Sequence, residues 1–289
     1  MKEKVKLIVV IPVGPGERME NVLDTVESVA HYMTEDRRIL ILDDSGRGAG
    51  KGVKAGFPDV EVLEQPGGQG AEGGLYMSIS NALKHAYENY DFRVVLKLDS
   101  DGLVIGGGAE DEAVEYFERN RDVGVIGSYR VSCTGEKRDF IGVKKAFVRE
   151  MRLWRMLISP GRCSAYRKIV PEIMGKGYEL GEHCQGGAYF MSQDCVKRLV
   201  ESGLLGKKEF NSDRIPEDSI IAMLVWKVGL RLGDFATGDL PMGIAWSGLP
   251  CSPEELLSRG KKITHSVRSW GSMSEGEIRG FFSERRNRV

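Results

Sequence analysis

The sequence predicts an α/β fold in which helices cover both faces of a mostly parallel central sheet. Two observations support this prediction: short runs of aliphatic, often β-branched residues alternate with longer segments whose apolar residues recur at helical spacing. Runs that are apolar throughout are typical of strands buried on both faces of a parallel sheet. Alternating strands and helices imply right-handed crossovers, which place the helices over the sheet.

The first predicted strand covers residues 7–13, because this aliphatic run is too short for a helix and rich in β-branched residues. A helix follows over 18–33, where apolar residues recur at helical spacing. The later predicted strands are 39–42, 60–63, 93–98 and 123–128, and the later helices are 75–90 and 110–120. Since no internal repeat or low-complexity linker is visible, we expect a single domain.

The composition excludes several classes of protein. Gly makes up 37 of the 289 residues, yet there is no Gly-X-Y period, and 41% of the residues are hydrophobic, so the chain is neither collagen-like nor disordered. With 41 Lys and Arg against 42 Asp and Glu, it is not a general polyanion binder, and no nucleic-acid partner is expected. Five Cys without a CxxC pair predict reduced, buried thiols. Because the N-terminal apolar run lacks the features of a signal peptide, and no stretch is apolar enough for a membrane helix, we expect a cytoplasmic protein.

The segments that follow the predicted strands are the candidate ligand-binding loops, because open α/β sheets bind ligands outside the carboxyl ends of their strands. These segments are 12–16, 43–46, 66–74 and 99–102. Three of them are rich in Gly and two contain paired carboxylates.

Three phosphate-loop interpretations compete in these segments. The Gly-Lys pair at 50–51 is not a P-loop, because Ser45 stands where the first Gly is required and Gly follows the Lys. The segment 68–73 matches GxGxxG and leaves a dinucleotide site open, but it follows the third strand and has only Asp91 as its acidic partner. The segment 14–19 has a Gly-rich loop and an Arg similar to those of sugar-nucleotide pyrophosphorylases, without their Pro-Lys pair, so a sugar-phosphate nucleotidyltransferase also stays open.

Asp99-Ser100-Asp101 is a candidate metal site. Two carboxylates separated by one residue follow a buried strand, and two anions gathered there require a cation. Oxygen ligands suit Mg²⁺ or Mn²⁺, which keep coordination positions open for substrate phosphates. The alternative is a turn in which the Asp side chains accept hydrogen bonds from backbone N–H groups.

These motifs, taken in order, resemble the GT-A glycosyltransferases, especially inverting members similar to glycosyltransferase family 2. Ile-Pro-Val at 11–13 is similar to the family's first strand end, Asp-Asp-Ser-Gly at 43–46 to its nucleotide loop, and Asp-Ser-Asp at 99–101 to its DxD motif. The resemblance implies a Rossmann-like α/β/α sandwich, with a nucleotide-binding half over about 1–130 and an acceptor-binding half over about 131–289. It assigns nucleotide binding to Pro12, Asp43, Asp44 and Asp99, and metal binding to Asp99 and Asp101.

Three later motifs extend the resemblance. Gly186 and Gly187 begin a segment similar to the family's acceptor-side strand, although a plain buried strand would look the same. Glu217 and Asp218 resemble the family's Glu-Asp motif, with Asp218 as general base and Glu217 on the acceptor side; acidic residues are also common at helix N-termini for capping. His265 stands at the late position where relatives supply a metal-binding His, and its alternative is a structural role.

The resemblance implies a glycosyltransferase of the hexosyl-transferring class. It would move a sugar from a nucleoside-diphosphate sugar, with a UDP-sugar the expected donor, to a hydroxyl of a carbohydrate or lipid-linked acceptor. Mn²⁺ or Mg²⁺ would neutralise the leaving diphosphate, and Asp218 would take the acceptor's proton in one inverting displacement. Besides the nucleotidyltransferase, the alternative is a non-catalytic GT-A-like protein that binds nucleotide-sugars.

The near-neutral total charge hides a basic segment. Residues 137–168 contain ten basic and two acidic residues, a local charge of +8. Within it, Phe147, Met151, Trp154 and Ile158 would share one face of a helix. Such a segment can lie on an anionic membrane, bind a phosphorylated acceptor, or be a core helix with a solvated basic face. We therefore keep peripheral membrane contact through 137–168 open.

Overall fold

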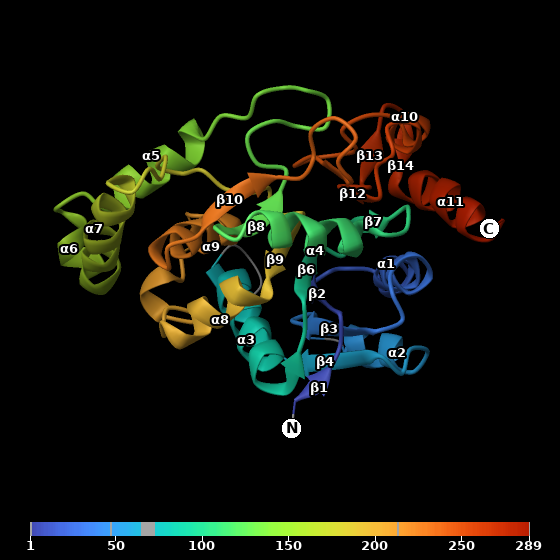
Figure 1. The fold of residues 1–289 in the computed structure, drawn as a ribbon, viewed down its shortest axis with the longest axis horizontal. Helices are drawn as coiled ribbons and strands as arrows, with labels where there is room; N and C mark the ends of the chain where they lie inside the picture. Colours follow the sequence, from blue (N-terminus) through green and yellow to red (C-terminus); the bar gives the residue numbers. More distant parts are fainter. Residues whose placement is uncertain (1, 47, 65–72, 213, 289) are drawn as a thin grey trace.

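The computed structural model describes residues 2–46, 48–64, 73–212 and 214–288 of the chain. Within this part, the largest sheet has seven strands (Figure 1). Their order across the sheet is β10 (Arg231–Asp234), β8 (Val123–Gly127), β9 (Ala188–Ser192), β6 (Val94–Leu98), β2 (Leu7–Val13), β3 (Arg37–Asp43) and β4 (Val60–Glu64). The predicted strands are confirmed, with ends that differ by no more than two residues from those expected.

The sheet is mostly parallel, and β9 is its one antiparallel strand among the residues described. β4, β3, β2 and β6 are mutually parallel, and β10 is parallel to β8. β9 lies between β6 and β8 and is antiparallel to both. Because of this reversal, the start of β9 lies beside the end of β6, and the Asp99 N–H donates to the Gly187 carbonyl oxygen at 2.9 Å.

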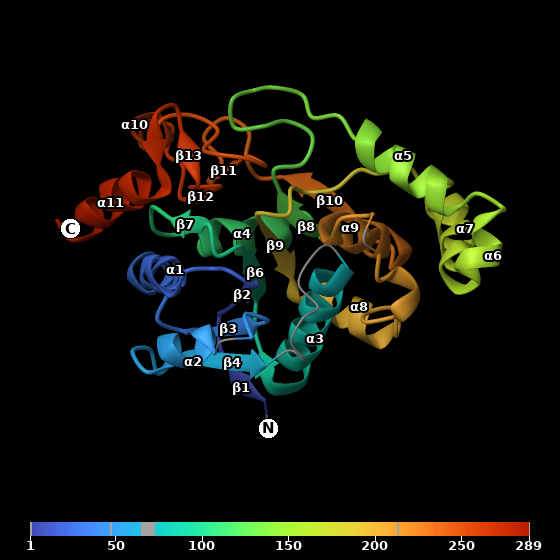
Figure 2. The same ribbon diagram turned by 180° about the vertical axis from the view of Figure 1, so that it is seen from behind.

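Helices pack on both faces of the sheet, as expected. In β2, Leu7 and Val9 belong to the apolar cluster that includes α1 (Met19–Tyr32) and α4 (Ala109–Arg119). The intervening Ile8 and Val10 belong to the cluster on the other face, with α3 (Gly73–Asn89). Alternate side chains of a strand point to opposite faces. The uninterrupted apolar run 7–13 therefore reflects a strand with a core on each side. Figures 1 and 2 show helices on both sides of this strand.

A three-stranded sheet that the sequence did not predict lies beside the carboxyl ends of the main strands. Its order is β11 (Met242–Ile244), β12 (Ile263–His265) and β7 (Gly102–Val104). β12 is antiparallel to β7 in a register that pairs His265 with Gly102. Since Gly102 directly follows Asp101, this pairing brings the late His to the paired carboxylates.

The remaining elements complete the layers. The helices are α2 (Ala49–Lys54), α5 (Ile141–Glu150), α6 (Arg155–Ile158), α7 (Pro160–Met174), α8 (Gln193–Glu201), α9 (Glu217–Lys227), α10 (Pro253–Ser258) and α11 (Glu275–Arg286), with a 3₁₀ turn at Lys208–Phe210. Two short strand pairs are β1 (Glu3–Lys4) with β5 (Tyr90–Asp91), and β13 (Ser269–Trp270) with β14 (Met273–Ser274). Among the helices described, none is both long and apolar enough to cross a bilayer.

The expectation of one amphipathic stripe through the basic segment is wrong. The chain breaks after α5 and turns before α6 and α7, so Phe147 and Ile158 do not share a face. Phe147 is fully buried against Tyr166 of α7, with ring centroids 5.4 Å apart, whereas Trp154 and Ile158 are exposed. Pro160 stands at the first position of α7, where a Pro is tolerated, so it explains the separate start of α7 and not the earlier break after α5. The GxGxxG segment at 68–73 lies almost wholly outside the described residues.

Candidate active site

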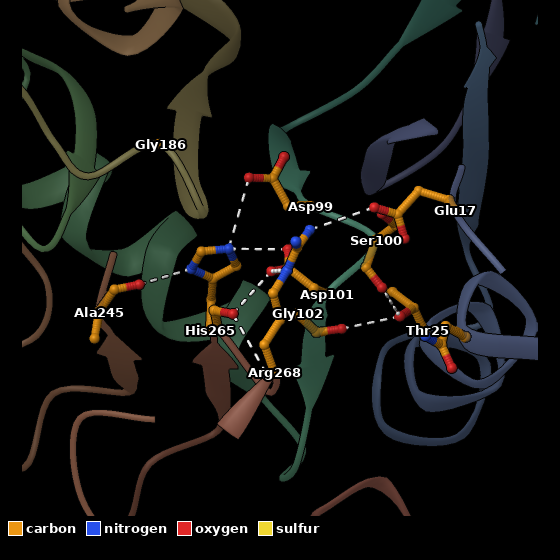
Figure 3. A network of polar contacts seen from close by, with 12 residues as sticks. Glu17, Thr25, Asp99, Ser100, Asp101, Gly102, Gly186, Ala245, His265 and Arg268 are labelled. Carbon is orange, nitrogen blue, oxygen red and sulfur yellow. Dashed lines mark hydrogen bonds and ion pairs between the residues drawn. The ribbon is translucent and has the colours of Figure 1, made fainter. Parts of the chain in front are cut away.

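Asp99, Asp101 and His265 lie together at the carboxyl end of β6. One ligand atom from each is within 4.8 Å of the others, and Figure 3 shows the three side chains directed toward one another. Two carboxylates come from the loop between β6 and β7, and the imidazole comes from the end of β12. The structure therefore brings together the three residues expected to bind metal.

Both nitrogens of the His265 ring face oxygen atoms. Nδ1 lies 2.9 Å from the Ala245 carbonyl oxygen, which can only accept, so Nδ1 carries a proton. Nε2 lies 3.0 Å from Asp101 Oδ1 and 3.7 Å from Asp99 Oδ2. Burial lowers the pKa of His265, but the hydrogen bond and charge of Asp101 outweigh it, and the net shift is upward. With Nδ1 committed to Ala245, Nε2 is the nitrogen that a metal ion would take.

The remaining oxygens of both carboxylates are bound by cationic side chains. Lys97 Nζ lies 2.6 Å from Asp99 Oδ1, and Arg268 Nε lies 2.7 Å from Asp101 Oδ2. Asp99 Oδ2 and Asp101 Oδ1, the two oxygens that face His265, are thus left for a ligand. This donor set of two oxygens and one imidazole nitrogen fits a divalent cation.

The carboxylate of Asp101 is held ionised. Burial opposes its ionisation, but hydrogen bonds from His265, Ser266 and Arg268 hold its pKa well below the usual range. Ser266 Oγ donates to Asp101 Oδ2 at 2.8 Å, beside the bond from Arg268. These contacts therefore favour the ionised form of Asp101.

Side chains from α1 and α11 support the loop between the carboxylates. Arg279 of α11 is buried and donates to the Ser100 carbonyl oxygen at 2.8 Å. The same oxygen accepts from Thr25 Oγ1 at 2.8 Å, and Arg279 forms an ion pair with Asp24 at 2.8 Å. Two helices distant in sequence thus fix the backbone of Ser100.

A cavity of about 270 Å³ opens next to the cluster. It is lined by Pro12, Val13, Gly14, Pro15, Glu17, Leu42, Asp44, Leu75, Ser78, Asp99, Ser100, Asp101 and Arg268. Pro12, Asp44 and Asp99, all expected to bind nucleotide, line this cavity, whereas Asp43 does not.

Asp43 and Asp44 are separated by their hydrogen bonds. Asp43 is buried; its Oδ1 accepts from the Ser45 N–H at 3.0 Å and from Ser45 Oγ at 2.5 Å, and its Oδ2 accepts from the Gly50 N–H at 2.8 Å. Asp44 Oδ1 is buried and has no hydrogen-bond partner among the residues described. Asp43 therefore shapes the loop, whereas Asp44 lines the cavity.

Gly186 and Gly187 are packed against candidate catalytic side chains. A Cβ on Gly187 would lie 2.1 Å from His265 Nδ1, and a Cβ on Gly186 would lie 2.9 Å from Asp218 Oδ2. Because consecutive Cα atoms are about 3.8 Å apart, these two Gly bring His265 and Asp218 to one short stretch of backbone. The absent side chains make room for protein groups at these positions.

Asp218 and Glu217 begin α9 but differ in environment. Asp218 accepts from Ser219 Oγ at 3.0 Å, and its Oδ2 lies 3.8 Å from His183 Nε2. Glu217 is buried and accepts from Tyr189 Oη at 2.5 Å. Burial raises the pKa of Glu217 to about 7, against the opposing charge of Lys97. Glu217 therefore lies within the core of the site.

Lys97, Ser266, Arg268 and Trp246 were not predicted from the sequence. Lys97 is fully buried in β6 and contacts both Asp99 and the Gly186 carbonyl oxygen. Burial opposes its charge, but the charges of Asp99 and Glu217 raise its pKa. The sequence does contain a signal for Lys97, because it is a Lys within an apolar strand, two residues before Asp99. Residues i and i+2 of a strand share a face, so contact between Lys97 and Asp99 could have been expected.

The similarity to known proteins lies in the fold. No protein-family model and no curated protein matches the chain. Among solved structures, the bifunctional glycosyltransferase WbbM has 10% identity and a TM-score of 0.51, over 99% of this chain and 50% of that one. The galactosyltransferase LgtC has 13% identity and a TM-score of 0.49, over 98% of this chain and 96% of the LgtC chain. The mannosyltransferase PcManGT from Pyrobaculum calidifontis has 13% identity and a TM-score of 0.46, over 81% of this chain and 55% of the PcManGT chain.

The chain spans about half the length of the WbbM and PcManGT chains. The WbbM match extends over nearly all of this chain. The predicted fold class is thereby confirmed: the chain has the α/β fold of the GT-A-like glycosyltransferases.

Proposed function

We propose that this protein is a metal-dependent glycosyltransferase. It transfers a hexosyl group from a nucleoside-diphosphate sugar, a UDP-sugar in the first instance, to a hydroxyl of a carbohydrate or lipid-linked acceptor, with inversion. The observation that carries this proposal is the convergence of the Asp99–Asp101–His265 cluster and Asp218 on the Gly186–Gly187 backbone, beside the cavity.

The cavity provides the chemistry needed by the donor. Asp44 lines the cavity, and its carboxylate accepts an N–H of the nucleobase, such as that of uracil. Arg268 lies at the same cavity and is partly exposed, so its guanidinium binds the diphosphate. The neighbouring Asp99, Asp101 and His265 would hold a divalent ion, which when bound supplies positive charge to the leaving diphosphate. We favour Mn²⁺ over Mg²⁺ because Mg²⁺ prefers oxygen ligands alone.

Asp218 is the proposed general base. Its carboxylate is only slightly exposed, and it lies beside Gly186 within the same site. It accepts the proton of the acceptor hydroxyl as that oxygen attacks the anomeric carbon from the face opposite the diphosphate. One displacement of this kind inverts the configuration of the sugar.

Trp246 is the proposed contact for the acceptor sugar. It directly follows Ala245, which binds His265, and its side chain is 87% exposed. The Gln185 amide, oriented to satisfy both groups, donates to the Ile244 carbonyl oxygen at 3.3 Å and accepts from the Trp246 N–H at 2.5 Å. Gln185 precedes Gly186, so the backbone of Trp246 lies near the stretch that carries the proposed base, and the apolar face of the exposed indole can pack on a sugar ring.

The test is nucleotide-sugar turnover by the purified chain. UDP-, GDP- and other nucleotide-sugars are incubated with Mn²⁺ and an acceptor panel, and released nucleoside diphosphate is measured. Asp218→Asn should reduce turnover by about 10²–10⁴-fold while Mn²⁺-dependent donor binding persists. Asp101→Asn should remove both, and Asp36→Asn, at an exposed carboxylate, should change neither.

Four results would overturn parts of this proposal. Failure of every nucleotide-sugar to bind in the presence of Mn²⁺ would remove the donor site. Wild-type turnover by Asp218→Asn would remove the base. Pyrophosphate formed from a sugar phosphate and a nucleoside triphosphate would identify a nucleotidyltransferase, and donor binding without turnover would identify a non-catalytic protein.

The proposal includes a place of action. We expect the enzyme in the cytoplasm, and a lipid-linked acceptor would bring it to a membrane surface. The basic segment 137–168 is the surface that we propose for this contact.

A further inference from the structure

Five large apolar side chains are exposed together at the end of the projecting helices α5–α7. This apolar tip consists of Leu153, Trp154, Met156, Leu157 and Ile158, in the turn after α5 and in α6. Leu157 is 88% exposed and Leu153 is 71% exposed. Single exposed apolar residues are ordinary, but a cluster of this kind marks a surface that binds an apolar partner.

The tip is adjacent to unpaired positive charge. A groove of about 610 Å³ runs along α5 and is lined by Ile141, Lys144, Lys145, Val148, Arg149 and Arg152. Within the described residues, no ion pair includes Lys144, Lys145, Arg149 or Arg152. These four cations are therefore available to an anionic partner.

The base of the tip is rigid. Glu150 is fully buried, and both of its oxygens accept from Arg155 NH2, at 2.9 and 2.8 Å. Arg214 lies 3.3 Å and Arg162 4.0 Å from the same carboxylate. The buried Arg155 and the more exposed Arg162 and Arg214 thus share one buried counter-ion, and this network fixes the turn that carries Leu153 and Trp154.

We propose that α5 and the apolar tip dock on the surface of an anionic lipid bilayer. Leu153, Leu157 and Ile158 enter the boundary between headgroups and acyl chains, and the α5 cations contact lipid phosphates. Apolar side chains flanked by Lys and Arg match the order of a bilayer, in which anionic headgroups lie above the acyl chains. This docking surface makes the proposed membrane contact of 137–168 specific. It rests on the proposed function in one respect, namely that a lipid-linked acceptor would be found at such a surface.

Figure 1 shows that the docking region lies at one end of the molecule and α11 at the other. Docking through α5–α7 therefore leaves the C-terminal helix away from the lipid. This arrangement provides a matched control, because the exposed Arg285 of α11 and the exposed Arg288 just beyond it can be reversed in charge without altering the docking region.

The test is co-sedimentation of the purified full chain with vesicles, which requires no enzymatic activity. We expect binding to vesicles of phosphatidylcholine mixed with phosphatidylglycerol, weakened by salt, and little binding to phosphatidylcholine alone. The double variant Leu153→Ser/Leu157→Ser should lose binding. Lys144→Glu/Lys145→Glu should weaken it by at least roughly fivefold per charge removed.

Arg285→Glu/Arg288→Glu makes the same charge change in the last turn of α11 and just beyond it, and this variant should bind as the wild type does. The altered side chains are exposed, so the melting temperatures should stay near that of the wild type, which checks that the variants fold. Absence of wild-type binding to anionic vesicles at low salt, or unchanged binding by Leu153→Ser/Leu157→Ser, would overturn the proposal. Dimerisation that this double variant abolishes would overturn it in favour of a contact between two copies. Turnover of soluble acceptors is independent of all these outcomes, so failure of docking and failure of the proposed reaction are distinguishable.

Discussion

Gly187→Ala is expected to damage the candidate metal site with a single methyl group. The added Cβ would lie 2.1 Å from His265 Nδ1, 2.3 Å from Cγ and 2.5 Å from Cε1. Ordinary contacts begin near 3.4 Å, so the ring must move by roughly 1.3 Å or the backbone must yield. The backbone is restrained, because the Gly187 carbonyl accepts from the Asp99 N–H. Either movement separates His265 from Asp99 and Asp101.

The cost follows from these contacts. Overpacking of a buried site typically costs about 1–3 kcal/mol in the free energy of unfolding. Loss of a group that merely orients a metal ligand reduces affinity about 10–100-fold, and here the ligand itself is displaced. We therefore expect Mn²⁺ affinity to fall by at least about 100-fold. Gly186→Ala should have a smaller effect, because its Cβ meets the end of the Asp218 side chain at 2.9 Å.

The assay is isothermal titration with Mn²⁺, combined with thermal melting. Gly142→Ala is the matched control, since a Cβ there meets nothing within 4 Å and Ala favours the helix. It should bind Mn²⁺ as the wild type does and melt at the same or a higher temperature. If Gly187→Ala retained wild-type Mn²⁺ affinity, His265 would not be a ligand in the arrangement described.

Three further predictions follow from individual side chains. Asp43→Ala should lower the free energy of unfolding by about 1–3 kcal/mol, because it removes the acceptor of the buried Gly50 N–H. Asp44→Ala should keep the melting temperature of the wild type but weaken UDP binding. Melting curves recorded with and without UDP distinguish the two effects. Because the pKa of Glu217 rises to about 7 on folding, the folded chain holds a proton that the unfolded chain has released. Stability should therefore fall by up to roughly 3 kcal/mol as the pH rises from 4.5 to 7, and Glu217→Gln should remove this dependence in melts across that range. Trp246→Ala should raise the acceptor KM roughly tenfold with donor binding unchanged, and Trp246→Phe should restore it; equal acceptor kinetics in all three proteins would contradict the proposed stacking.

Local patterns of the sequence predicted the strands of the sheet better than the reversal within it. The run 7–13 is apolar on both faces and coincides with β2, because burial of both faces leaves its mark on consecutive residues. β9 is equally apolar, and nothing in its residues distinguishes an antiparallel from a parallel neighbour. The prediction of one apolar stripe through Phe147 and Trp154 was wrong for a related reason. Helical periodicity places residues on one face only within a continuous helix, and the turn between α5 and α6 ends that helix.

The candidate site was predictable in its residue types and not in its arrangement. The resemblance named Asp99, Asp101 and His265, and the structure brings them together. Asp43 and Asp44 are identical neighbours in the sequence, so only their hydrogen bonds show which one faces the cavity. The pairing of β12 with β7 joins distant segments, and sequence spacing carries no information on such a register.

The distance along the chain between Asp101 and His265, 164 residues, also determines when the site can form during synthesis. A nascent chain that ends before β12 contains the two carboxylates and Lys97 but no imidazole to complete them. The loop that closes this contact is long, and contacts of high sequence separation form late in folding. Metal capture at the proposed site would therefore be a late event in the synthesis and folding of each molecule, because incomplete chains lack His265.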